Sequence, residues 1–218
     1  RNLVADVAHE LRTPLAILQG STEALLDGVD QPTPEVLASL NDEVSRLRRL
    51  VGDLETLAAA EAAGQHPRTD LVDLADVVTS AADLLRPLAE DRDTDLTIDA
   101  LPAEVIGDAD RLHQIAVNLI ANAVKFTPAG GTIRISTRLE ATSACLEVAD
   151  NGPGIPDDEL SHVFERFWRG ANRDKASGSG IGLAVVAELV AAHHGTVTAG
   201  NVAGGGARFT VTLPAASS

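Results

Sequence analysis

Residues 8–14 read Ala-His-Glu-Leu-Arg-Thr-Pro and place a histidine directly before a glutamate. A histidine can act as a nucleophile when a neighbouring acid holds the proton on its second ring nitrogen. An apolar stripe at helical spacing passes through this segment, formed by Val4, Val7, Leu11 and Leu18. His9 lies off the stripe and therefore points away from it on a helix. By itself, the segment is equally consistent with a solvent-exposed histidine on a helix kinked at Pro14.

A row of polar side chains follows one face of the helix expected over residues 108–125. Its members are Arg111, Gln114, Asn118, Asn122 and Lys125. A separate face is apolar and consists of Leu112, Ile115, Ala116, Leu119, Ile120 and Ala123. Asparagine is a poor helix former, and its carboxamide oxygen can complete a Mg²⁺ shell that already holds phosphate oxygens and water. Lys125 can reach an anionic phosphate, although a polar surface stripe would show the same pattern.

A glycine-rich turn follows the strand expected to end at Val148 and reads Asp150-Asn151-Gly152-Pro153-Gly154. Gly152 and Gly154 allow the backbone to approach a flat ligand closely. The Asp150 carboxylate can accept a hydrogen bond from an exocyclic amine such as that of adenine. The same five residues also suit an ordinary tight turn.

A second glycine-rich segment, Gly178-Ser179-Gly180-Ile181-Gly182, opens the helix expected over residues 181–194. The backbone N–H groups and the positive dipole end of such a helix favour phosphate. The stretch from Glu165 to Lys175 is basic and supplies Arg166, Arg169, Arg173 and Lys175. We expect this stretch to be a mobile lid over a bound nucleotide.

Composition narrows the classes of function. The chain has 218 residues and a formal net charge of −15, which argues against nucleic-acid binding through bulk electrostatics. An acidic protein can bind a polyphosphate only through a local basic cluster and a divalent metal. The single cysteine, Cys145, excludes an internal disulfide and a cysteine metal cage, and we expect it to be an inert packing residue.

No apolar run approaches the ~20 residues that span a bilayer, and no signal peptide is visible. Arg1 is not a natural start, and the chain opens in the middle of a helix. We therefore expect it to be a fragment of a longer protein, with room for a membrane segment upstream.

Residues 1–66 are expected to form an all-α helical hairpin. The first helix spans about residues 1–27, and Thr33 and Pro34 suit the start of the second helix after a connection over residues 28–33. The second helix carries a coiled-coil seam formed by Leu37, Leu40, Val44, Leu47, Val51, Leu54 and Ala58. Two copies that pair as a four-helix bundle would bury both apolar faces, so we predict a homodimer. A hairpin folded onto the second domain is the alternative.

Residues 67–218 are expected to form an α/β two-layer sandwich with a mixed sheet. Apolar periodicity marks one helix over residues 77–88 and strands at residues 96–98, 133–139, 146–148, 197 and 209–213. Residues 151–182 show little regular pattern, which indicates a long loop.

In this order, the segments resemble the motifs of the sensor histidine kinases of two-component systems, across essentially the whole chain. His9 lies in HELRTP, which matches the phosphoacceptor box, and NLIANAVKFT matches the asparagine box through Asn118 and Asn122. DNGPGI matches the first glycine box, VFERFW the phenylalanine box through Phe164 and Phe167, and GSGIGL the second glycine box.

This resemblance implies that ATP and Mg²⁺ bind the second domain, as in the superfamily that includes DNA gyrase. Asn122 would be the principal Mg²⁺ ligand, and Asn118 would help to order the metal and the phosphates. Asp150 would accept from the adenine amine, which favours ATP over GTP. The nucleotide site would further contain Lys125, Gly152, Gly154, Arg166, Arg169, Lys175, Gly178, Gly180, Gly182 and Leu183.

The resemblance also implies a reaction. His9 would attack the γ-phosphorus of ATP, while Glu10 holds the proton on the other ring nitrogen. The phosphohistidine would pass its phosphoryl group to an aspartate of a response regulator that docks near His9. Thr13, one turn after His9, matches the family's phosphatase pattern and would position a water that hydrolyses the regulator's acyl phosphate. The chain would then be the cytoplasmic portion of an inner-membrane-anchored sensor.

Two other functions fit parts of the pattern. A kinase-like dimeric adaptor would dock a regulator without using ATP, but the intact asparagine and glycine boxes argue against it. A gyrase-type ATPase clamp would only hydrolyse ATP. Such clamps place a water-activating glutamate near the position held here by Asn118, and they lack the histidine hairpin.

Overall fold

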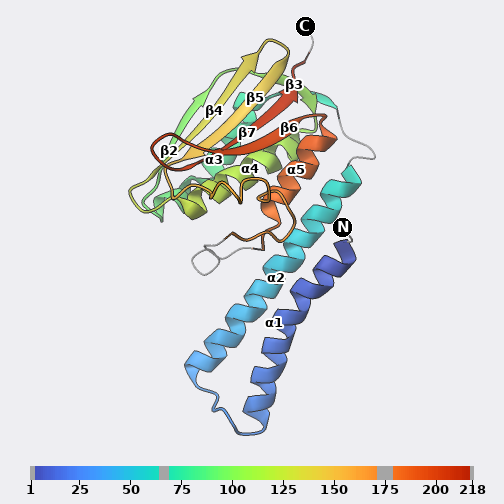
Figure 1. Cartoon of the computed structure of the whole chain (residues 1–218), viewed down its shortest axis with the longest axis vertical. Coiled ribbons are helices and arrows are strands. Elements are labelled where there is room, and N and C mark those ends of the chain that lie inside the picture. The colour runs from blue at the N-terminus through green and yellow to red at the C-terminus, as the bar shows by residue number, and fades with distance from the viewer. Residues whose placement is uncertain (1–2, 64–68, 171–178, 217–218) are drawn as a thin grey trace. The chain divides into compact units, whose positions relative to one another are not determined.

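The computed structural model describes residues 3–63, 69–170 and 179–216 (Figure 1). Contacts divide the chain into two units, residues 1–56 and residues 57–218. The expected boundary between residues 66 and 67 falls outside the described residues and stays a prediction. None of the helices in the described ranges is long and apolar enough to cross a membrane.

The first unit is the helical hairpin that the sequence predicts. Helix α1 spans Leu3–Leu26, and helix α2 spans Pro34–Ala63 and continues into the second unit. Thr33 lies just before α2, where its Oγ1 accepts from the backbone N–H of Val36 at 3.4 Å, and Pro34 is the first helical residue. This is the expected start of the second helix. Pro14 lies inside α1 and does not end it.

The apolar seam of α2 is only partly covered within the chain. Leu40 and Leu47 are half-buried. Leu37, Val44 and Val51 recur at heptad spacing and remain 51%, 45% and 45% exposed, respectively. The hairpin therefore has an apolar surface on α2 that is left open to solvent.

The second unit is a two-layer α/β sandwich, which confirms the expected fold class. Its five-stranded sheet has the order β2-β4-β5-β7-β6. The strands span Asp95–Ala100, Thr132–Glu140, Ser143–Asp150, Ala207–Pro214 and Thr196–Asn201 in that order. The sheet is mixed, because β2 and β4 are parallel and the remaining neighbours are antiparallel.

Three helices pack on one face of this sheet: α3 at Leu74–Glu90, α4 at Ala109–Phe126 and α5 at Gly182–Ala192 (Figure 1). Alternate residues of the strands point toward these helices and form the core. Ile133 and Ile135 of β4 are fully buried, and Phe209 and Val211 of β7 are almost so. The six apolar residues predicted for the core face of α4 are all buried.

A second sheet of two short strands was not expected from the sequence. Strand β1 spans Asp70–Asp73 and pairs antiparallel with β3 at Glu104–Gly107. Strands of four residues are too short to show a period-2 pattern above chance. Their pairing also joins segments that α3 and β2 separate in the chain.

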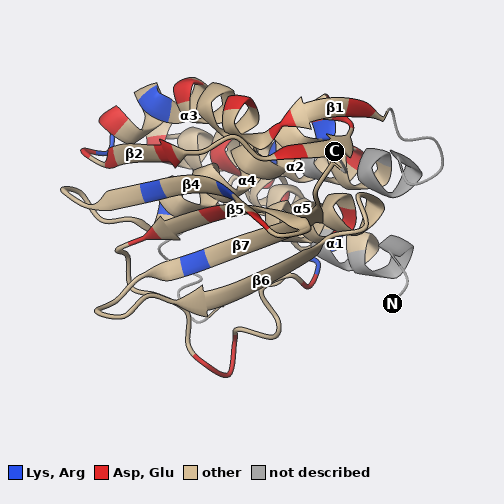
Figure 2. Cartoon of the chain, turned by 90° about the horizontal axis from the view of Figure 1, so that it is seen from above, with Lys and Arg blue, Asp and Glu red and all other residues tan. Residues whose placement is uncertain are grey.

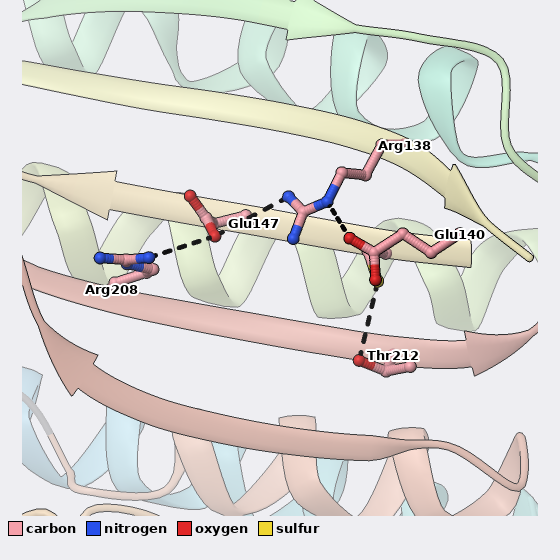
Figure 3. A network of polar contacts seen from close by, with 6 residues as sticks. Arg138, Glu140, Glu147, Arg208 and Thr212 are labelled. Atoms are coloured by element: carbon pink, nitrogen blue, oxygen red, sulfur yellow. Dashed lines mark hydrogen bonds and ion pairs between the residues drawn. The ribbon is translucent and has the colours of Figure 1, made fainter. Parts of the chain in front are cut away.

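The face of the five-stranded sheet that carries no helix has few charged residues (Figure 2). Glu147 of β5 lies 3.9 Å from both Arg138 and Arg208, and Arg138 also pairs with Glu140 (Figure 3). These pairs are partly solvated and contribute little to stability. Cys145 lies beside this network, 3% exposed and with its Sγ 3.9 Å from Oγ1 of Thr212. It is a free, buried packing residue, as expected.

A buried histidine joins the end of α5 to the start of α4. Nδ1 of His193 donates to the carbonyl of Leu189 at 2.7 Å, and Nε2 accepts from the backbone N–H of Asp108 at 3.1 Å. The first bond needs a hydrogen on Nδ1 and the second needs a lone pair on Nε2, so the geometry requires the neutral ring. Asp108 in turn caps α4 by accepting from two of its first N–H groups. A Cβ at Gly107 would lie only 2.7 Å from His193, so the ring also requires a glycine there.

We predict that His193→Phe lowers the free energy of unfolding by about 2–4 kcal/mol. A phenyl ring fills the place of the imidazole, but the Asp108 N–H and the Leu189 carbonyl lose their hydrogen-bond partner. Urea unfolding of the whole chain measures the change. His194→Asn is the control, since His194 is exposed and its φ of 58° suits asparagine. An unchanged midpoint for His193→Phe would show that these two bonds contribute nothing.

Candidate functional site

The polar row predicted on α4 is half-buried throughout, from Arg111 to Lys125. The carboxamides of Asn118 and Asn122 make no hydrogen bond to any described residue. A Cβ at Gly182 would lie 3.5 Å from Oδ1 of Asn118, so the first residue of α5 packs beside that amide. The structure thus places the start of α5 beside Asn118 of the polar row.

Basic residues gather at the C-terminal end of α4. Burial is the main cause that lowers the pKa of Lys125, and the charges of Arg169 and Arg92 lower it further. Arg92, in the turn after α3, donates to the carbonyls of Val124 and Lys125 at 3.1 and 3.0 Å. This cation therefore satisfies two of the last carbonyls of α4 and faces the negative end of the helix dipole.

Arg92 is a residue that sequence reasoning missed. It lies 33 residues before Lys125 in the chain and carries no motif. Three cations with overlapping fields, in a chain of net charge −15, form the local basic cluster that binding a polyphosphate requires.

Asp150 is the last residue of β5, two residues beyond the expected end of that strand, and it is 6% exposed. Its Oδ1 accepts from the backbone N–H groups of Gly152 at 2.8 Å and Ala207 at 3.2 Å. Burial raises the pKa of the Asp150 carboxyl, and these two hydrogen bonds oppose the rise. Its Oδ2 accepts no hydrogen bond from the residues that the structure describes. A ligand with an N–H donor would supply the missing partner.

The turn after Asp150 is held tightly by the protein's own backbone. Asn151 exchanges two hydrogen bonds with Thr132, through its Oδ1 at 2.9 Å and its backbone N–H at 3.2 Å. A Cβ at Gly152 would lie 2.8 Å from the carbonyl oxygen of Phe126, at the end of α4. Gly152 is therefore needed for close approach to α4, whatever ligand the turn binds.

The loop predicted to be a lid is closed at its base. The N–H of Phe167 donates to the carbonyl of Gly180 at 3.0 Å. Gly180 has a φ of 75°, and a Cβ there would lie 2.6 Å from the carbonyl oxygen of Trp168. Ser179 then accepts from the N–H of Ile181, which begins the turn into α5. Residues 171–178, including the predicted Lys175 and Gly178, lie outside the described residues.

Other residues of the predicted motifs lie near the point where this loop meets α5. Arg166 donates to Glu188 of α5 at 3.0 Å, so in this structure it binds an acid of the protein. Phe164 packs edge-on against the ring of Phe209, with 6.2 Å between centroids, which ties the loop to the sheet. Leu183 is half-buried in the first turn of α5.

The predicted phosphoacceptor segment lies on α1. His9 and Glu10 belong to this helix, but their side chains lie outside the described part of the chain. Thr13 is exposed, one turn further on. Within the described ranges, no three His, Cys, Asp or Glu side chains cluster as a metal site would require. The half-buried Asn122 and Asn118 amides instead fit a magnesium ion that takes most of its ligands from phosphate and water.

Two family models match the chain. The family described as histidine kinase-, DNA gyrase B-, and HSP90-like ATPase matches residues 107–217. The His Kinase A (phospho-acceptor) domain matches residues 1–63.

Individual relatives extend over nearly all of the chain. It is 40% identical over 218 residues to the signal transduction histidine-protein kinase BaeS of Escherichia coli, covering 98% of this chain and 46% of BaeS. It is 35% identical to the histidine-protein kinase/phosphatase MprB of Mycolicibacterium vanbaalenii, covering 94% of this chain and 43% of MprB. The solved structure of full-length ShkA in complex with AMPPNP is 31% identical, with a TM-score of 0.70 over 98% of this chain and 46% of ShkA. The chain thus spans less than half the length of each of these proteins.

We predict that Asp150→Asn raises the urea midpoint of the nucleotide-free chain at pH 7. The pKa of this carboxyl is raised on folding, so ionising it costs folding free energy as the pH rises above about 3.9, its value when unfolded. The uncharged amide avoids that cost, and its advantage should shrink as the pH is lowered toward the same value. Asp157→Asn, at an exposed aspartate of the same loop, is the control. A lower midpoint for Asp150→Asn at pH 7 would show that the carboxylate is net stabilising.

Proposed function

Because the chain belongs to the sensor histidine kinases of two-component systems, we propose that it transfers the γ-phosphoryl group of ATP to His9 and then to an aspartate of a response regulator. The observation that carries this proposal is the position of Gly182, the first residue of α5, beside the amide of Asn118. In the proposed site, an amide row that can bind a metal would thereby adjoin a helix start that can bind phosphate.

Asp150 selects the base in this proposal. Its Oδ1 is occupied by two backbone N–H groups, and its Oδ2 is left to accept from the exocyclic amine of adenine. Guanine would present a carbonyl oxygen to the same carboxylate, with no donor between them. An unpaired polar contact of this kind discriminates strongly, so ATP is the expected substrate and GTP is rejected.

The phosphates would lie between the polar row of α4 and the start of α5. Asn122 would be the main protein ligand of Mg²⁺, with Asn118 beside it. A magnesium ion bound there would neutralise charge on the phosphates as the γ-phosphoryl group departs. Lys125 and Arg169 add two cations, and the backbone N–H groups at Gly182 and Leu183 add donors at the positive end of α5. Catalysis in this site rests on positioning and charge neutralisation.

His9 receives the phosphoryl group. One ring nitrogen forms the bond to phosphorus as ADP leaves, and Glu10 holds the hydrogen on the other nitrogen so that the attacking nitrogen keeps its lone pair. The hairpin would act as a homodimer. Support comes from the open apolar surface of Leu37, Val44 and Val51, whose heptad spacing suits a four-helix bundle of two copies.

The hairpin would also promote hydrolysis of the acyl phosphate on the response regulator. Thr13 is exposed on α1 one turn after His9. Its hydroxyl can orient a water toward the acyl phosphate of the regulator that docks there. The name of MprB, which joins kinase and phosphatase, supports this part of the proposal.

We predict that His9→Gln abolishes incorporation of label from γ-labelled ATP, because glutamine offers no nucleophilic nitrogen. ATP binding should stay within twofold of the unsubstituted chain, since none of the residues proposed for the nucleotide site lies on α1. Acid-labile labelling and calorimetric ATP binding are the two measurements, with His194→Asn as control. Label persisting at another residue would refute His9 as acceptor, and steady ATP turnover without protein labelling would favour an ATPase clamp.

We predict that Thr13→Ala slows dephosphorylation of the phosphorylated regulator by about 10-fold or more, because the hydrolytic water loses its orienting hydroxyl. Autophosphorylation should change less than twofold. Thr22→Ala is a matched control, since Thr22 is also an exposed threonine on α1 and its hydroxyl only donates to the carbonyl of Leu18. Equal losses in both reactions would remove any special role of Thr13.

A further inference from the structure

Asn201, the last residue of β6, forms two hydrogen bonds with the glycine-rich turn that follows Asp150. Its Oδ1 accepts from the N–H of Ile155 at 2.8 Å, and its Nδ2 donates to the carbonyl of the same residue at 2.7 Å. Gly154 makes room for this contact, because a Cβ there would lie 2.9 Å from Oδ1 of Asn201. One carboxamide therefore satisfies both backbone groups of a residue 46 positions away in the chain.

The same β6–β7 hairpin also contacts the beginning of the turn. The N–H of Ala207 donates to Oδ1 of Asp150 at 3.2 Å. Gly206, with a φ of 103°, lies so close that a Cβ would be 1.8 Å from the backbone oxygen of Asp150. The hairpin thus holds the turn at Asp150 and again at Ile155. The two contacts lie at either end of the turn that leads away from the Asp150 carboxylate.

The chemistry of the Asn201 contact requires a donor and an acceptor side by side. Aspartate has the same shape but cannot donate to the Ile155 carbonyl, and alanine can do neither. Asn201 is exposed, so its two hydrogen bonds are not forced by burial. Exposed hydrogen bonds contribute little to global stability. Their effect here is to restrict the turn to one position.

We propose that Asn201 is a positioning residue for the adenine end of the nucleotide site. By fixing residues 151–155, it holds the Asp150 carboxylate where the base meets it. This inference deepens the proposed function and rests on ATP being the ligand. It assigns specificity for the base to a residue outside the asparagine, phenylalanine and glycine boxes, although within the family match over residues 107–217.

The test compares Asn201→Asp and Asn201→Ala in the whole chain. We expect the Kd for ATP, measured by calorimetry, to rise about 10-fold in each variant. The preference for ATP over GTP should fall. Once the turn can move, the acceptor oxygen of Asp150 is no longer held at the position where it distinguishes the adenine amine from the guanine carbonyl. In autophosphorylation, KM should rise while kcat changes less than twofold, since the groups around the phosphates are untouched.

Thr198→Ala, at an exposed threonine of the same strand, is the matched control and should leave all of these values unchanged. The urea midpoint of both Asn201 variants should stay near that of the unsubstituted chain. Unchanged ATP affinity with an unchanged ATP/GTP ratio would overturn the inference, as would a lowered urea midpoint with equal losses for both nucleotides. If the unsubstituted chain binds no ATP, the proposed function itself fails, which separates the two failures.

Discussion

The buried carboxylate of Asp150 is the constraint on which the arrangement of the second unit depends. Removing a charge from water costs free energy unless donors surround it. Here the two donors to Oδ1 come from different segments, Gly152 in the turn after β5 and Ala207 at the start of β7. The hydrogen bonds to Oδ1 of Asp150 therefore hold these two segments together. The other oxygen has no protein donor among the described residues, and the adenine amine of the proposed substrate would complete its shell.

Helix α4 connects this constraint to the rest of the site. Its apolar face is fully buried against the sheet and the neighbouring helices, which fixes the direction of its polar row. Its start is capped by Asp108, which His193 holds in turn, and its last carbonyls are satisfied by Arg92. These contacts hold both ends of the helix that carries Asn118 and Asn122. Fixed positions suit groups that must order a metal and phosphates.

The end of α4 carries a local group of cations in an otherwise acidic chain. The chain carries a net charge of −15, yet Lys125, Arg92 and Arg169 lie near enough for their fields to lower the pKa of the lysine. Burial and the two neighbouring cations disfavour the charged form of Lys125 in the nucleotide-free protein. A bound polyphosphate would offset the like-charge repulsion. Ionisable groups perturbed in this way are frequent at functional sites.

The sequence alone determined the elements with long apolar periods and the chemistry-bearing residue types. The seam of α2 and the two faces of α4 extend over many turns, so their periodicity exceeds chance, and both helices formed as predicted. The four-residue strands β1 and β3 carry too few residues for that signal. The asparagines, the aspartate and the glycine-rich turns could be recognised because their chemistry depends on residue type and local spacing.

Only the tertiary structure decided what holds those residues in place. The partner of Asp108 is 85 residues away at His193, the partner of Ile155 is Asn201, and the cation at the end of α4 comes from the turn after α3. Each of these contacts joins a backbone group to a side chain distant in the chain. Backbone N–H and carbonyl groups are the same at every residue apart from the missing N–H of proline, so nothing in local sequence marks which of them a remote side chain will bind. Their pairing is set by the path of the folded chain.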